Sequence, residues 1–134
     1  MPEIERISGI GQVLAQAFSQ VGINTTESLL QEGATSKGRQ RIAEKTKISP
    51  GLILRWVNQA DLFRVKGVGE QYADLLEVAG VDTVAELAQR KPENLYQKMV
   101  EVNEKRSRVR QVPSLSQVKR WVNEAGELSR VVTY

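Results

Sequence analysis

The sequence contains no cysteine and no histidine, and these two absences remove several classes of function. Without thiolates or imidazoles, the chain cannot form disulfide bonds, zinc sites with Cys or His ligands, or catalytic sites that use histidine as acid or base. A phosphate-binding loop of the form Gly-x-x-x-x-Gly-Lys-[Ser/Thr] is also missing. The sequence therefore predicts a protein that is not an enzyme and that uses no metal and no other cofactor.

Long apolar runs are missing as well. No stretch approaches the roughly 18 residues that a membrane-spanning helix needs, and the acidic start of the chain, residues 1–5, does not have the pattern of a signal peptide. Hydrophobic residues make up 40% and charged residues 26% of the 134 positions, as in ordinary folded domains. We expect a cytoplasmic protein with no membrane contact and no evident small-molecule substrate.

What the sequence does contain is an internal repeat, which is the first feature to look for in a new chain. Ile7-Ser8-Gly9-Ile10-Gly11 recurs 58 positions later as Val65-Lys66-Gly67-Val68-Gly69. Near the end of each copy, the stretch 55–60 recurs 65 positions later as 120–125. These offsets predict a tandem duplication whose second copy carries seven extra residues, placed between Ala88 and Pro113.

The repeat divides the chain into two units, residues 1–62 and 63–134. No linker rich in Pro, Gly or Ser separates them, so we expect the two halves to pack as one compact body.

Apolar residues recur at helical spacing in both units, and no segment has the pattern of a strand. We therefore predict an all-α fold of two pseudo-symmetric halves with four to five helices each. Thr25 is an expected helix N-cap, although Ser28 three residues later is not expected to complete a capping box. Trp56 and Trp121 occupy equivalent places on apolar helix faces, so we expect both in the core rather than stacked on bases.

Each unit begins with a Gly-hydrophobic-Gly turn followed by a helix. Glycine permits a tight turn, and the backbone amides that open the next helix can face an anion. Gln12 and Glu70 follow these turns where DNA-binding hairpins usually carry Pro, Lys or Arg, and a carboxylate there repels phosphate. The alternative is that the turns only pack two helices together. The candidate turn residues are Gly9, Gly11, Gly67 and Gly69.

The stretch from Val65 to Ala88 resembles the helix-hairpin-helix units of DNA repair proteins and the N-terminal domain of RecA-like archaeal recombinases. The whole chain is similar to an uncharacterised bacterial family of tandem helix-hairpin-helix proteins, a domain of unknown function. The matching stretches are Gly33-Ala34-Thr35-x-Lys37-Gly38-Arg39, Trp56-Val57-Asn58-x-Ala60-Asp61-Leu62 and Val132-Thr133-Tyr134. This resemblance implies a duplicated helix-hairpin-helix (SAM-like) fold, and it implies no particular activity.

Charge alternates along the chain. Residues 1–34 carry a net charge of −3, residues 35–66 carry +6, residues 67–104 carry −5 and residues 105–134 carry +5. The basic blocks are candidates for tracking a phosphate backbone, and the ordinary alternative is a solvated face balanced by nearby acids. The candidate nucleic-acid-binding residues are Lys37, Arg39, Arg41, Lys45, Lys47, Lys66, Lys105, Arg106, Arg108 and Arg110.

Two functions remain open at this point. The first is binding of DNA through its backbone, without sequence specificity. The second is a protein-interaction or assembly module, in which acidic blocks of one molecule meet basic blocks of a partner or of a second copy.

Overall fold

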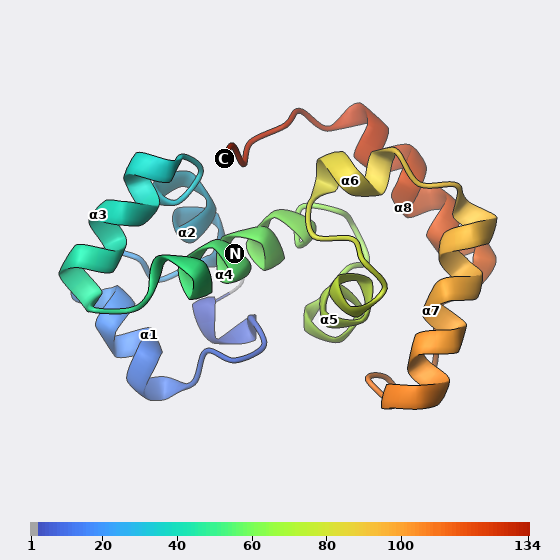
Figure 1. The fold of residues 1–134 in the computed structure, drawn as a ribbon, viewed down its shortest axis with the longest axis horizontal. Coiled ribbons are helices and arrows are strands. Elements are labelled where there is room, and N and C mark those ends of the chain that lie inside the picture. The colour runs from blue at the N-terminus through green and yellow to red at the C-terminus, as the bar shows by residue number, and fades with distance from the viewer. Residues whose placement is uncertain (1–2) are drawn as a thin grey trace. The chain divides into compact units, whose positions relative to one another are not determined.

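The computed structural model describes residues 3–134, and the regular secondary structure of this part of the chain is helical (Figure 1). A short 3-10 helix and eight α-helices are connected by short loops, and the only pairing of extended backbone in these residues is an isolated bridge between Glu3 and Thr25. The prediction of an all-α fold is confirmed. The elements are η1 (Ile4–Arg6), α1 (Gln12–Ser19), α2 (Thr26–Glu32), α3 (Ser36–Thr46), α4 (Pro50–Leu62), α5 (Glu70–Val78), α6 (Val84–Ala88), α7 (Pro92–Arg106) and α8 (Leu115–Glu127).

The helices form two compact units. Among the described residues, the first contains residues 3–61 together with residues 131–134, and the second contains residues 62–130. The repeat predicts the last four residues in the second unit, whereas in the structure they pack with the first. None of the helices in residues 3–134 combines the length and the hydropathy needed to cross a membrane.

The first unit closes around aliphatic side chains and two aromatic rings. Phe18 of α1 and Trp56 of α4 meet edge to face, with ring centroids 5.9 Å apart, a geometry that aromatic pairs favour. Trp56 is 3% exposed, which confirms its expected place in the core. The other buried aliphatic side chains described for helices α2 to α4 and the segments before them include Ile4, Ile7, Ile23, Leu29, Ile42, Ile53 and Val57.

One local prediction in this unit was wrong. The Thr25 side chain accepts from the Ser28 amide, as expected, but the Ser28 hydroxyl also accepts from the Thr25 amide at 3.0 Å. The capping box at the start of α2 is therefore complete. A serine hydroxyl can take the place of the usual Glu or Gln because the N-cap amide lies within reach of its short side chain.

The core of the second unit forms where α6 and α7 pack on α8 and α5 packs on α7. Trp121 of α8 is 3% exposed and lies against Tyr72 of α5, with ring centroids 5.3 Å apart. Apolar side chains from all four helices complete this core, among them Leu75, Leu76, Val84, Leu87, Leu95, Met99 and Val118.

The extra length of the second unit lies in two places. Helix α7, the third α-helix of the second unit, has fifteen residues, whereas α3, the third α-helix of the first unit, has eleven. The segment that follows runs over eight residues from 107 to 114, whereas its counterpart after α3 is the three-residue segment 47–49. Both helices end on a residue in the left-handed region, Lys47 with φ of 64° and Ser107 with φ of 49°. Because α6 is two residues shorter than α2, the longer helix and the longer loop together account for the seven additional residues.

Candidate nucleic-acid interface

The two Gly-hydrophobic-Gly turns, which we call the first and the second hairpin, have the same backbone geometry. In the turns 7–10 and 65–68, the amide of the last residue donates to the carbonyl of the first at 3.1 Å. The third residue of each turn has a positive φ, +97° at Gly9 and +91° at Gly67. This is the type II arrangement, in which a left-handed third residue is almost always glycine. The glycines singled out in the sequence are therefore needed for the turns.

A buried tryptophan indole lies close to each of these turns. A Cβ added at Gly9 would lie 3.3 Å from Nε1 of Trp56, and one added at Gly67 would lie 3.2 Å from Nε1 of Trp121. The turn glycine thus has two reasons to be there, its backbone conformation and the closeness of the indole. Both units therefore have a glycine at the third turn position and a tryptophan indole beside it.

The other two predicted glycines begin helices. Gly11 and Gly69 are the N-caps of α1 and α5, with extended backbone and no side-chain cap. The opening amides of both helices are therefore not capped by the N-cap side chain, which is a favourable arrangement for an anion. In the second unit, however, Glu70 is exposed at the first position of α5.

A second carboxylate faces the same hairpin. Glu124 of α8 accepts a hydrogen bond from the backbone amide of Lys66 at 2.7 Å. One amide of the second hairpin is thereby already bonded to an acidic side chain of the chain itself. With Glu70 and Glu124 both at this turn, the second hairpin is a poor site for phosphate.

Arg39, one of the predicted site residues, lies inside the protein. It is 6% exposed, and its guanidinium donates to the carbonyls of Gly33 at 2.9 Å, Ala34 at 3.2 Å and Thr133 at 2.8 Å. Burial lowers the pKa of this guanidinium from its ordinary value, and a Coulombic interaction with Tyr134 acts in the opposite direction. The prediction that Arg39 is available to a nucleic acid is wrong, because its donors serve the ends of α2 and the terminal segment.

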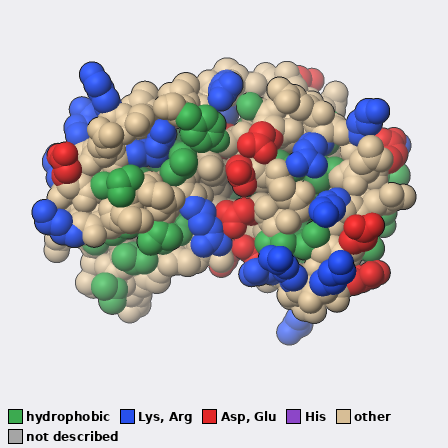
Figure 2. Space-filling model, in the orientation of Figure 1, with side chains coloured by type: hydrophobic (Ala, Val, Ile, Leu, Met, Phe, Trp, Pro, Cys, Tyr) green, Lys and Arg blue, Asp and Glu red, His purple; other side chains and the backbone are tan. Residues whose placement is uncertain are grey.

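The remaining cations of α3 do form an exposed row. Lys37, Arg41 and Lys45 are spaced four residues apart, so they lie on one side of the helix at intervals of about 6 Å. All three side chains are exposed, and Glu44 is the one acidic residue of this helix. Along the edge of the first unit where α3 lies, Lys and Arg side chains predominate over Asp and Glu (Figure 2). We call these three residues the α3 row.

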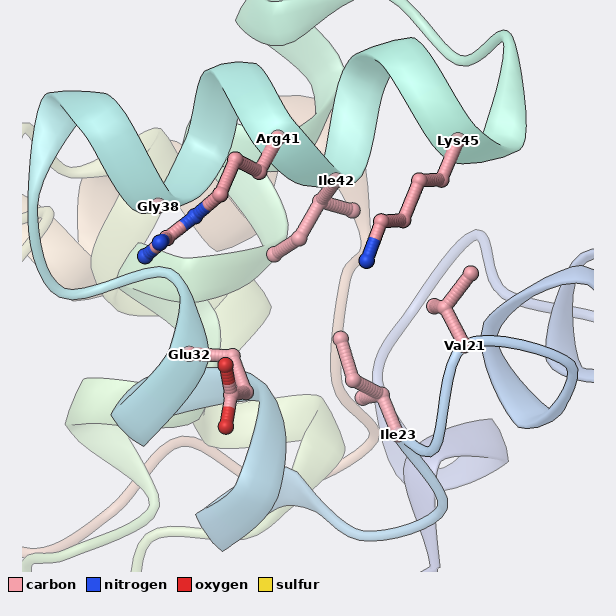
Figure 3. A pocket seen from close by; sticks show the side chains of 7 residues that line it. All are labelled: Val21, Ile23, Glu32, Gly38, Arg41, Ile42 and Lys45. Atoms are coloured by element: carbon pink, nitrogen blue, oxygen red, sulfur yellow. The ribbon is translucent and has the colours of Figure 1, made fainter.

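A cleft with a volume of about 190 Å³ opens beside the α3 row (Figure 3). Arg41 and Lys45 extend over it from α3, and Glu32 stands at the end of α2 on the other side. The aliphatic lining comes from Ile42 of α3 and from the loop after α1, where the lining residues are Val21 and Ile23.

The cleft depends on a close approach between α2 and α3. A Cβ at Gly38, in the first turns of α3, would overlap with the backbone carbonyl oxygen of Glu32. Only glycine at this position lets α3 lie so close to the end of α2. The cleft and Glu32 were not predicted from the sequence. The one signal of this contact is the glycine inside an otherwise polar helix.

The basic residues of the second unit are exposed but more scattered. Lys105 and Arg106 occupy the last turn of α7, where cations favourably face the helix dipole. Arg108 lies 3.4 Å from Asp74 of α5, so part of its charge is already paired. Lys66 is exposed in the turn before α5, and Arg110 is exposed in the loop after α7. Lys47, which belongs to the first unit, is exposed at the C-cap of α3.

Comparison with known proteins places this chain in a family. The family model described as a domain of unknown function, DUF4332, matches residues 8–128, so the chain belongs to that family. Searches among curated proteins and among solved structures found no match.

Proposed function

We propose that this member of the family is a non-catalytic protein that binds the backbone of nucleic acids without sequence preference. The α3 row is its main contact. The observation that supports this most directly is that Lys37, Arg41 and Lys45 project from one side of a single helix. A rigid row of cations lowers the cost of arranging several phosphate contacts together, and each phosphate neutralised releases counterions. The exposed cations after α7 supply a second, weaker contact.

We further propose that both units are copies of one helix-hairpin-helix unit. Three matched features support this: the left-handed turn glycines Gly9 and Gly67, the glycine N-caps that follow them, and the tryptophan indole beside each turn. In this proposal the two copies have diverged. The first hairpin keeps neutral residues at its helix start, and the second carries Glu70 and Glu124.

The test is a titration of labelled duplex DNA with the full chain at two salt concentrations. Sequence-independent binding has dissociation constants on the order of 10⁻⁴–10⁻⁶ M at physiological salt and tightens steeply as salt is lowered. The triple variant Lys37→Glu, Arg41→Glu, Lys45→Glu should weaken binding and make the salt dependence shallower by about one unit of slope for each cation removed.

A matched control separates the α3 row from net charge. Arg6, Lys91 and Lys98 are exposed cations outside the α3 row, and reversing them to Glu changes the net charge by the same amount. The proposal requires the α3-row triple variant to lose clearly more affinity than this control. Absence of duplex binding by the wild-type chain at low salt, or equal losses in the two triple variants, would contradict it.

Light scattering in the same buffers tests the assembly alternative. A chain that self-associates at low salt and does not bind DNA would support contacts between acidic and basic blocks of different molecules instead.

A further inference from the structure

The cleft beside the α3 row has a size and a lining that select among nucleic acids. From these features we infer that it receives one unpaired base, so that the preferred substrate of the proposed site is a single strand. This inference rests on the function proposed above and names its substrate class. It depends on Glu32, Arg41, Lys45 and the three aliphatic residues that line the cleft.

The volume matches a small planar group. Pockets for drug-sized molecules enclose about 300–1,000 Å³, whereas this cleft encloses about 190 Å³. A single ring system is therefore a better match than a larger ligand. A base of a single strand is such a group, and it is already attached to the phosphates that the α3 row binds in the proposed mode.

The cleft is lined by a guanidinium group and by aliphatic side chains, and both can pack on the face of an unpaired base. The faces of a base are apolar and stack on flat groups, including the guanidinium plane of arginine. Arg41 brings such a plane to the cleft, and Val21, Ile23 and Ile42 form its aliphatic lining (Figure 3). Lys45, on the next turn of α3, is placed to hold an adjacent phosphate.

Glu32 adds a preference among bases. A carboxylate accepts hydrogen bonds and cannot donate them, so it favours bases with an exocyclic amino group, such as cytosine. Thymine presents a carbonyl oxygen at the position where cytosine carries its amino group, and an oxygen facing a carboxylate is unfavourable. The side chain of Glu32 is exposed, so the preference should be about fivefold, the low end of what one contact to a base edge supplies.

In a duplex the bases are stacked and paired, so they cannot enter the cleft unless a base pair opens, which is costly. Duplex DNA then contacts only the cations. This difference separates the present inference from the proposed function, because the phosphate contacts need no cleft.

The experiment compares twelve-nucleotide oligodeoxycytidine and oligodeoxythymidine, which have equal length and charge. Fluorescence anisotropy at one low salt concentration should give about fivefold tighter binding of the cytosine strand. Glu32→Gln should bring the ratio of the two affinities close to one, because an amide both donates and accepts. Glu44→Gln removes the same charge from an exposed position of α3, so it should strengthen binding of both strands and leave the ratio unchanged.

A second variant tests the cleft itself. Val21→Phe fills the space from its loop side without changing any charge, so duplex binding should persist while the preference for cytosine is lost. Far-UV circular dichroism checks that the variant keeps its helices. If Val21→Phe misfolds, the ratio of cytosine-strand to thymine-strand affinity in Glu32→Gln decides the inference. Equal wild-type affinity for both strands, or a preference unchanged in Glu32→Gln, would overturn the inference while duplex binding keeps the proposed function standing. Failure to bind any of the three nucleic acids would overturn both.

Discussion

The guanidinium of Arg39 donates to the carbonyl oxygen of Thr133 at 2.8 Å, across 94 positions of the sequence. The amide of Thr133 in turn donates to the carbonyl of Ala34, also at 2.8 Å. The residue before Thr133, Val132, is 2% exposed. Main-chain hydrogen bonds and one buried side chain thus make residues 131–134 an integral part of the first unit.

Arg39→Met should lower the free energy of unfolding by about 2–3 kcal/mol, because it leaves buried carbonyls without a charged donor. Methionine keeps most of the length of the side chain, so lost packing is a minor contribution. Lys37→Met, an exposed position on the same helix, is the control and should change stability by less than about 0.5 kcal/mol. Urea unfolding followed by circular dichroism measures both, and faster hydrogen exchange at the Thr133 amide should accompany Arg39→Met alone. Equal urea midpoints for the two variants would contradict the structural role of Arg39.

Gly67→Ala should destabilise the second unit by about 1–2 kcal/mol, because an L-residue is disfavoured in the left-handed region. The added Cβ also approaches the Trp121 indole to 3.2 Å. Gly126→Ala is the matched control in the same unit, since it lies in α8 with open space around it. That variant should be neutral or stabilising by up to about 1 kcal/mol, because alanine is the better helix former. The prediction is thus a difference in sign, and thermal unfolding of the two variants decides it.

Asn103 makes two side-chain hydrogen bonds to the loop after α7. Its side-chain amide donates to the carbonyl of Val109 at 3.0 Å, and its side-chain oxygen accepts from the amide of Val109 at 2.9 Å. We expect Asn103→Ala to cost about 1–2 kcal/mol, because two partly buried backbone groups lose their partner. Arg108→Ala removes a 3.4 Å ion pair whose arginine side chain is 42% exposed, so it should cost less than about 1 kcal/mol. A larger loss for Arg108→Ala than for Asn103→Ala in urea unfolding would show that the ion pair is the anchor.

Sequence periodicity identified the elements that depend on local patterns. The all-α fold class and the burial of Trp56 and Trp121 follow from the spacing of apolar residues along the sequence, because this spacing shows which face of a helix is buried. The left-handed conformations of Gly9 and Gly67 follow from the Gly-hydrophobic-Gly pattern, because few other residues adopt such a turn.

Features that depend on long-range contacts were not predictable in this way. In the sequence, Arg39 has the pattern of a surface cation in a basic stretch. Only its hydrogen bond to the carbonyl of Thr133 shows why it is buried. The cleft needs Glu32 and Arg41 brought together by the close approach at Gly38, and spacing within one helix carries no information on that approach. Similarly, Glu124 lies 58 positions from the amide of Lys66 that it contacts.

Asp82 gives the second unit a predictable response to pH. Burial raises the pKa of this carboxyl group above its ordinary value, and repulsion from Glu86 and Glu77 raises it further. The folded state therefore binds a proton more readily than the unfolded state, so the free energy of unfolding should increase as pH falls from neutral through the raised pKa towards the unfolded value of 3.8. Below that value both states are protonated and the contribution of Asp82 no longer changes.

Asp82→Asn should remove this dependence, because the amide carries no charge at any of these pH values. The variant should unfold at a higher temperature than the wild-type chain at pH 7, and the difference should shrink as the pH approaches 4. Glu104→Gln, which removes one charge from an exposed position of α7 in the same unit, is the control for net charge. Thermal unfolding of the three chains at pH 7, 5.5 and 4 measures the effect. An Asp82→Asn variant that is less stable than the wild-type chain at pH 7 would show that the charged carboxylate is stabilising, contrary to the environment formed by Glu77 and Glu86.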